Sequence, residues 1–258
     1  MKLGTCAYSY RDMLTNGEMT PLEFLDLAAE LNFDGVEWTS YYFPETTKEY
    51  LVNVKRETFV RGLDISATAT GGNFADADPD KRKAQIDNVK EWIEKSVWLG
   101  SSALRVFAGG CPDEVERSEA EKWVTDGLAK CAVLAEKEGV ILGLENHGGL
   151  TADAKGTLAL IEPFKNNPWV RINLDFGNFT GDVYAQYEQC APYTATTHTK
   201  VTVRQGDERE LVDYRRVVRI MRENAYDGYI NIEYEESEPP IPNVERFASY
   251  LRGCIVDA

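Results

Sequence analysis

The sequence is poor in histidine and has no paired cysteines. It contains two histidines and five cysteines, and the cysteines (Cys6, Cys111, Cys131, Cys190 and Cys254) are scattered without a Cys-x-x-Cys pair. These counts exclude a histidine-rich metal cluster and argue against a zinc-thiolate or disulfide framework. We therefore expect reduced thiols and a cytoplasmic location.

Positive charge is also scarce. Lys and Arg number 28 against 43 Asp and Glu, which gives a formal net charge of −15. A field of that sign repels nucleic-acid phosphates and acidic membrane surfaces, so we expect neither as a partner. The negative net charge does not exclude a small phosphorylated substrate, because a local Arg or Lys can bind a single phosphate group. No apolar run is long enough for a membrane span, and the first residues do not resemble a signal peptide.

Short apolar segments alternate with longer amphipathic ones along the whole chain. The short segments are rich in β-branched and aromatic residues, and most are too uniformly apolar to have a solvent face. That pattern is typical of parallel strands covered by helices. The predicted strands are Leu3–Tyr8, Gly35–Trp38, Ile65–Thr70, Ala103–Phe107, Ile141–Glu145, Ile172–Asp175, Thr194–His198 and Tyr229–Glu233.

Helix starts lie between these strands. Thr20 with Glu23, Thr46 with Glu49, and Ser118 with Glu121 each match a capping box. Eight strands alternating with eight helices, without a linker or a composition shift, predict an α/β fold: a single (β/α)8 TIM barrel over residues 1–258. A doubly wound sheet is the alternative, but no Gly-x-Gly-x-x-Gly follows the first strand.

Ionisable side chains stand at the ends of the predicted strands, where the catalytic residues of such barrels lie. Four of them, at the ends of the last four strands, are of the types that bind metals: Glu145, Asp175, His198 and Glu233. Any one alone can be a helix cap or a structural ion pair, but four in succession favour a metal site. Three carboxylates and one imidazole suit Mn²⁺, Mg²⁺, Co²⁺ or Zn²⁺.

The residues around these four positions resemble the xylose isomerase-like barrel superfamily. Within it, the sequence is most similar to the sugar phosphate isomerase/epimerase group, which includes the ketose 3-epimerases. The resemblance covers nearly the whole chain. Its motifs are LENHGG at 144–149, NLDFGNF at 173–179, HTK at 198–200 and IEY at 232–234.

The resemblance implies one divalent metal ion, with Mn²⁺ expected, and a small sugar or keto-sugar substrate. In that family, the metal chelates adjacent oxygens of a ketose, acidifies the C–H between them and stabilises the enediolate. Glu145 and Glu233 are implied to be an acid/base pair as well as ligands, and Asp175 and His198 to be ligands only. Arg204 matches a position that reaches the substrate or the catalytic Glu. Family barrels often dimerise or tetramerise, so a homo-oligomer is compatible with the resemblance.

The sequence departs from the family pattern in two places. Family epimerases often have a substrate-contacting His three residues after the Asp ligand, where this chain has Asn178. Asn can hydrogen-bond a hydroxyl but cannot exchange protons. His147 lies two residues after Glu145, so a continuing strand points both side chains to one face. His147 is therefore a candidate general acid or base, or else a neutral imidazole bonded to a loop carbonyl.

Three further residues are candidates for substrate binding. Lys200 lies two residues after His198, so both side chains are expected to face the same side. It is a candidate for binding an anionic or hydroxyl group, and a solvated loop lysine is the alternative interpretation. Arg105 ends the fourth strand and is expected to line the mouth of the barrel. Trp38 follows Glu37 at the end of the second strand and is a candidate for stacking on a sugar face, although packing between loops explains it equally well.

Four functions are to be compared with these residues. The first is a metal-dependent isomerase or epimerase that transfers a proton next to a ketone through an enediolate. The second is a metal-dependent lyase or dehydratase acting on a keto-sugar or 3-keto-glycoside by β-elimination, with His147 as acid/base. The third is a DNA-repair barrel of the endonuclease IV type, which needs several histidines and a basic groove. The presence of only two histidines and a net charge of −15 exclude this function. A non-catalytic binding barrel is disfavoured by the complete ligand set.

Overall fold

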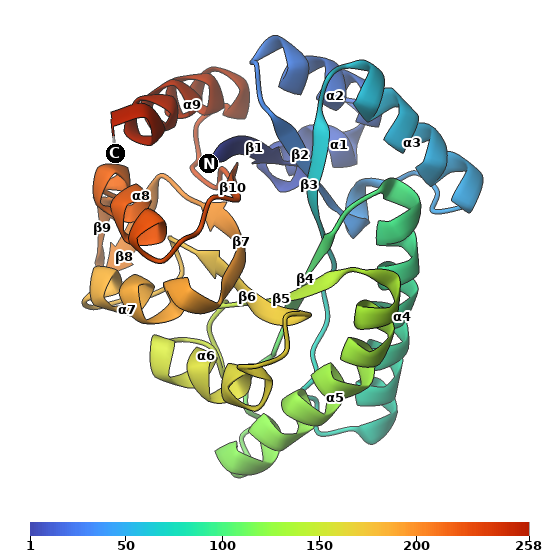
Figure 1. Cartoon of the computed structure of the whole chain (residues 1–258), viewed down its shortest axis with the longest axis vertical. Helices are drawn as coiled ribbons and strands as arrows, with labels where there is room; N and C mark the ends of the chain where they lie inside the picture. The colour runs from blue at the N-terminus through green and yellow to red at the C-terminus, as the bar shows by residue number, and fades with distance from the viewer. Residues whose placement is uncertain (258) are drawn as a thin grey trace.

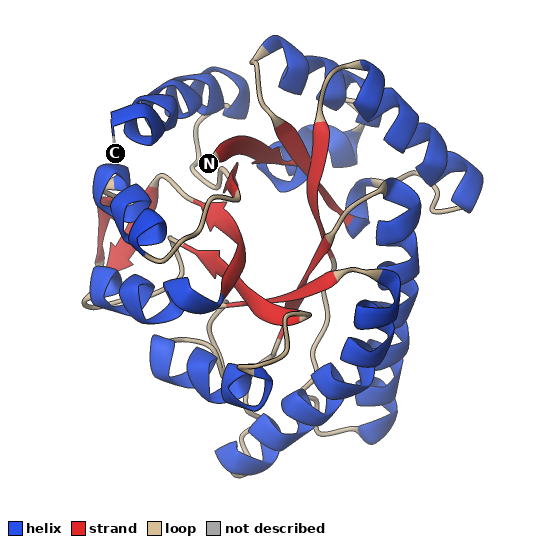
Figure 2. Cartoon of the chain, viewed as in Figure 1, coloured by secondary structure: helices blue, strands red, loops and turns tan. Residues whose placement is uncertain are grey.

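The computed structural model describes residues 1–257. Eight parallel strands form a closed barrel in the order β1-β10-β7-β6-β5-β4-β3-β2, and α-helices surround it (Figures 1 and 2). β1 (Lys2–Cys6) closes the barrel by pairing with both β10 (Tyr229–Ile232) and β2 (Gly35–Thr39). The predicted (β/α)8 barrel is confirmed.

The remaining elements follow the predicted alternation. The other barrel strands are β3 (Asp64–Ala69), β4 (Ala103–Phe107), β5 (Ile141–Glu145), β6 (Val170–Asp175) and β7 (Thr194–Thr199). The helices are α1 (Arg11–Asn16), α2 (Pro21–Glu30), α3 (Lys48–Val60), α4 (Pro79–Leu99), α5 (Arg117–Glu138), α6 (Ala154–Ile161), α7 (Val183–Cys190), α8 (Tyr214–Glu223) and α9 (Pro240–Asp257). No helix within the described residues is both long and apolar enough to cross a membrane.

One of the three predicted capping boxes forms. Thr20 and Glu23 exchange both hydrogen bonds at the start of α2. At α3 the cap is Thr47 instead, whose Oγ1 accepts a hydrogen bond from the Tyr50 N–H (3.3 Å). The hydroxyl of Thr46 accepts one from Lys95 Nζ (2.9 Å). The box at Ser118 was also wrong, since α5 already begins at Arg117.

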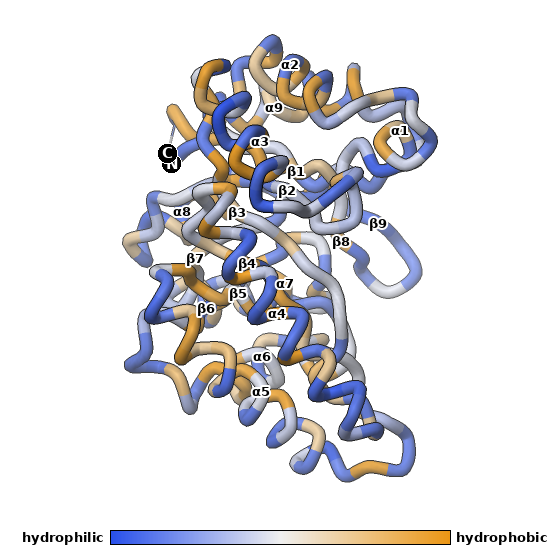
Figure 3. Tube along the Cα trace, turned by 90° about the vertical axis from the view of Figure 1, so that its right-hand side faces the viewer, coloured by the Kyte–Doolittle hydropathy of each residue, from blue (hydrophilic) through white to orange (hydrophobic). Residues whose placement is uncertain are grey.

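A β-hairpin inserted after β7 was not predicted. β8 (Thr202–Gln205) and β9 (Glu208–Leu211) pair antiparallel across a two-residue turn, in which Gly206 has a φ of 62°. Glycine at the first turn position readily takes that left-handed conformation. The hairpin is mostly hydrophilic and projects beyond the barrel (Figure 3). Glu236, after β10, holds it by bonds to Thr202 (2.7 Å) and Arg209 (2.8 Å).

Neighbouring residues of a barrel strand face opposite sides, and this alternation places the site. In β2, Glu37 points into the barrel and contacts His198 of β7. Trp38, the next residue, points outward and is fully buried between Phe24 of α2 and Phe43, with ring centroids 5.0 and 4.9 Å away. Apolar side chains thus form the layer under the helices, while polar ones fill the C-terminal half of the barrel.

Candidate metal centre and active site

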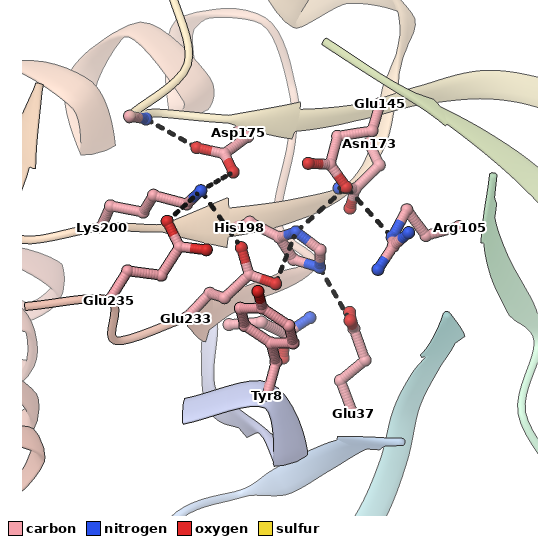
Figure 4. A network of polar contacts seen from close by, with 12 residues as sticks. Tyr8, Glu37, Arg105, Glu145, Asn173, Asp175, His198, Lys200, Glu233 and Glu235 are labelled. Atoms are coloured by element: carbon pink, nitrogen blue, oxygen red, sulfur yellow. Dashed lines mark hydrogen bonds and ion pairs between the residues drawn. The ribbon is translucent and has the colours of Figure 1, made fainter. Parts of the chain in front are cut away.

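Four side chains converge where the barrel strands end. Glu145 ends β5, Asp175 ends β6, His198 lies in β7 and Glu233 follows β10. One ligand atom from each lies within 4.8 Å of the others, and all four side chains are buried (Figure 4). The strand order places β5, β6, β7 and β10 side by side, so chain segments up to 88 residues apart meet at one rim.

The ring of His198 is held in one orientation. Its Nε2 lies 2.7 Å from Oε1 of Glu37, a buried carboxylate of β2. Its Nδ1 faces Glu145 Oε2 at 3.3 Å and Glu233 Oε1 at 3.5 Å. A carboxylate on one ring nitrogen fixes the tautomer and leaves the other nitrogen for a cation, the usual arrangement of metal-binding histidines.

Asp175 is fixed through its main chain. The Asn146 side chain accepts a hydrogen bond from the Asp175 N–H (2.7 Å) and donates to its carbonyl (2.9 Å). Oδ1 of Asp175 accepts from the Gly177 N–H (2.6 Å), while Oδ2 lies 3.2 Å from Lys200 Nζ. One carboxylate oxygen is therefore committed to the loop, and the other faces the site.

Glu145 lies among donors. Arg105 Nε is 3.0 Å from its Oε2, Asn173 Nδ2 donates to Oε2 (3.3 Å), and Asn178 Nδ2 donates to Oε1 (3.2 Å). Arg105 is itself fixed by a bond from Nη1 to the Thr70 carbonyl (3.1 Å). Asn178 thus contacts a candidate catalytic carboxylate at the position where the family often has histidine.

Lys200 joins three carboxylates. Its Nζ lies 2.7 Å from Glu235, 3.2 Å from Asp175 and 3.4 Å from Glu233, and it donates to Asn178 Oδ1 (3.3 Å). The side chain is nearly buried. The solvated-loop interpretation of this lysine was therefore wrong.

Burial and neighbouring charges shift the acidities of the two carboxylates in opposite directions. Burial acts to raise the pKa of Glu145, but the charges of His198 and Arg105 outweigh it and lower the pKa to about 2. Burial raises the pKa of Asp175 to about 7, and Glu145 and Glu233 add to that rise while Lys200 opposes it. Three carboxylates this close together destabilise one another when all are charged.

The two basic groups respond to the same crowding. Burial acts to lower the pKa of His198, but Glu233 and Glu37 raise it well above its ordinary value. The pKa of Lys200 is raised in the same way, against burial, by Asp175 and Glu233. The site therefore binds positive charge strongly, and a metal ion at Nδ1 of His198 would replace a proton there.

The residues present fit a divalent cation. Among the described residues, His198 Nδ1 and Asp175 Oδ2 are buried atoms that lack a hydrogen bond of good geometry. Such buried polar atoms are costly unless something else satisfies them. Both belong to the four-residue group, whose oxygen and imidazole donors match divalent metals of the Mn²⁺ and Mg²⁺ type.

A cavity of about 180 Å³ opens beside Glu145 and Glu233. His147 lines it, is exposed, and packs its ring against Phe107 with the centroids 4.4 Å apart. The His147 N–H donates to Thr151 Oγ1 (3.0 Å), which anchors the loop. Glu145 and His147 were predicted to face the same side, and both line this cavity. The lining residues are Tyr8, Tyr41, Arg105, Phe107, Glu145, His147, Glu233 and Glu235.

Of the five predicted substrate-binding residues, Arg105 lines this cavity. Asn178 and Lys200 are not part of its wall but contact Glu145 and Glu235, which are. The other two also lie outside the wall. Trp38 is in the aromatic layer under α2, because its parity in β2 is opposite to that of Glu37. Arg204 is exposed on the β8–β9 hairpin, where it pairs in register with Arg209. Within residues 1–257, no ion pair joins Arg204 to the four converging side chains.

Three residues that contact the site were not predicted. Asn146 and Asn173 bond Asp175 and Glu145, and Glu235 pairs with Lys200. The sequence does contain an indication for Glu235: it lies two residues after Glu233, so the two side chains are expected to face the same side. Asn146 follows Glu145 and points away from it, so only the folded loops reveal its contact.

Comparison with known proteins identifies the family. A family model described as a xylose isomerase-like TIM barrel matches residues 25–254. The chain belongs to this family. The resemblance in its sequence motifs is thereby confirmed. No curated protein sequence matches this xylose isomerase-like barrel significantly.

Solved structures share the fold at low sequence identity. An L-ribulose 3-epimerase matches with a TM-score of 0.80 and 16% identity, over 99% of this chain and 95% of the other. A 3-keto-D-glucoside 4-epimerase from E. coli gives 0.76 and 18%, over 98% and 100%. A probable 3-DHS dehydratase from Bacillus anthracis gives 0.70 and 18%, over 99% of both chains. These similarities establish the barrel fold that the xylose isomerase-like chain shares with epimerases and a dehydratase.

Proposed function

We propose that this protein is a divalent-metal-dependent isomerase or epimerase that moves a proton next to the ketone of a small keto-sugar. The observation that carries the proposal is the pair of carboxylates Glu145 and Glu233. They come from separate strands, flank His198 Nδ1 at 3.3 and 3.5 Å, and line one cavity. The epimerases with the same fold favour this chemistry.

Glu145, Asp175, His198 and Glu233 would hold the ion. A divalent cation there would supply positive charge beside the substrate's adjacent oxygens, which lowers the cost of removing the proton between them. The protein's own groups do the rest. One of the two glutamates takes the proton from carbon, and the other returns a proton to the opposite face.

The surrounding residues keep these two carboxylates in place. Arg105 and Asn178 hold the two oxygens of Glu145, and Lys200 holds Glu233. Such fixed partners limit the reorganisation needed when charge develops on the substrate. Phe107 and the tyrosines of the cavity wall restrict water around the reacting carbon.

A second function, elimination, is favoured by His147. This imidazole is exposed and lines the same cavity as Glu145. After a glutamate removes the proton, His147 would protonate the oxygen that leaves as its bond to the β-carbon breaks. The dehydratase with the same fold is in line with this alternative.

Proton exchange tests the proposal. Chelator-treated protein, with and without added Mn²⁺, is incubated in deuterated water with a panel of ketoses, and loss of the C–H signal is followed by NMR. We expect exchange with at least one ketose only after Mn²⁺ is added. Equal exchange without metal, or none with any ketose, contradicts the proposal. Accumulation of an epimer or an isomer supports the first function, and accumulation of an enone supports elimination.

A further inference from the structure

The cavity beside the metal ligands has a definite size and chemical character. Its volume of about 180 Å³ is below the roughly 300–1,000 Å³ of pockets that bind drug-sized molecules. It therefore suits a ligand of monosaccharide size. Aromatic rings from Tyr8, Tyr41 and Phe107 form part of its wall, and three carboxylates form another part.

The third carboxylate, Glu235, has no part in the proposed ligand set. It lies two residues beyond Glu233, lines the cavity, and pairs with Lys200 at 2.7 Å. Its side chain is 31% exposed, whereas those of Glu145 and Glu233 are 2% and 6% exposed. Glu235 is thus the carboxylate most open to a bound molecule.

The charges of the site stay negative even with a metal bound. Five carboxylates (Glu37, Glu145, Asp175, Glu233 and Glu235) interact with two permanent cations, Arg105 and Lys200. With His198 neutral as a ligand, three negative charges are left over. A divalent ion would reduce that surplus to one.

Both cations already have partners. Arg105 is 3% exposed, lies against Glu145 and the Thr70 carbonyl, and has its guanidinium 4.0 Å from the Phe107 ring centroid. Lys200 lies between Asp175, Glu233 and Glu235. Among the described residues that line the cavity, Arg105 is the one Arg or Lys, and its charge is already paired. Arg11, which lies 5.0 Å from the Tyr8 ring centroid, donates to the carbonyls of Tyr8 and Tyr234.

We propose that Glu235 is a specificity determinant, which selects an uncharged keto-sugar over the phosphate ester of that sugar. The inference rests on the proposed function and defines the substrate class of the same site. The Glu235 carboxylate can accept hydrogen bonds from the hydroxyls of a bound sugar. A phosphate monoester brings a charge of about −1.5 to −2 at neutral pH, which Glu235 repels.

Binding of a matched pair of sugars tests this assignment. Mg²⁺-loaded protein is titrated with D-fructose and with D-fructose 6-phosphate, and the two Kd values are compared by saturation-transfer NMR. We expect the wild type to prefer D-fructose. Glu235→Gln should shift the ratio of the two Kd values about tenfold toward the phosphate. The matched control is Glu236→Gln, whose carboxylate bonds Thr202 and Arg209 instead of lining the cavity, and it should keep the wild-type ratio.

The salt dependence of the two Kd values is a second readout, which a purely structural role of Glu235 would not change. Because salt screens the repulsion between Glu235 and the phosphate, raising the salt concentration should reduce the wild-type preference for D-fructose over D-fructose 6-phosphate. The ratio of the two Kd values should change less in Glu235→Gln. Equal or tighter binding of the phosphate, no detectable binding of D-fructose, or an unchanged ratio in Glu235→Gln overturns the inference. Phosphate binding that depends on Arg204 also overturns it. Failure of the proposed function is seen separately, as absence of metal-dependent exchange with every ketose.

Discussion

Glu145→Gln and Glu233→Gln should each lower the rate of substrate C–H exchange by about 10²–10⁴-fold, the usual contribution of a positioned acid or base. Glutamine keeps the size of glutamate but cannot accept a proton from carbon. Because both residues are also proposed ligands, the variants are compared at a Mn²⁺ concentration that restores metal occupancy. Exchange should stay low there, as measured by NMR in deuterated water.

The control for this experiment is Glu162→Gln, which removes an exposed carboxylate paired with Lys165 after α6. It should retain wild-type exchange. Exchange at the wild-type rate in both active-site variants would refute the role of the glutamate pair. Loss in only one variant would show that this glutamate alone removes the proton from the epimer tested.

Glu37→Ala should destabilise the metal-free protein by about 3–5 kcal/mol, the usual result of removing one partner from a buried charged pair. Glu37 and His198 are both fully buried, with Oε1 and Nε2 2.7 Å apart. The same change should weaken metal binding about 10–100-fold, because the ring loses the carboxylate that directs Nδ1 toward the ligands. Urea unfolding and calorimetric metal titration measure the two effects.

Glu37→Gln is the matched comparison for that prediction. Its amide oxygen can still accept a hydrogen bond from Nε2–H, so the tautomer that leaves Nδ1 for the metal is retained. We expect smaller losses of stability and of metal affinity than in Glu37→Ala. Wild-type metal affinity in Glu37→Ala would show that Glu37 does not position His198.

The sequence predicts much of the barrel and the four converging residues for one physical reason. Parallel strands buried on both faces are uniformly apolar, so ionisable residues at their C-terminal ends stand out. Closure of the barrel then brings those ends to one rim. Glu145, Asp175, His198 and Glu233 were predicted together on this basis, and the fold does bring them together.

Other contacts depend on packing that no local pattern records. The bond between Glu37 and His198 crosses the barrel between residues 161 positions apart. The alternation of side chains along a strand predicts the position of Trp38, because an inward-facing Glu37 requires an outward-facing neighbour. The hairpin was missed because its polar strands lack an apolar face, although Gly206 with Asp207 is a typical tight turn.

Calorimetric titration shows whether the four converging residues bind a metal ion. Chelator-treated wild type and Asp175→Asn are titrated with Mn²⁺ under the same conditions. We predict one ion per wild-type chain, and affinity weakened at least about tenfold in Asp175→Asn, where a neutral amide replaces a charged ligand. Absence of binding by the wild type, or equal affinity in Asp175→Asn, would show that these four residues do not form a metal site.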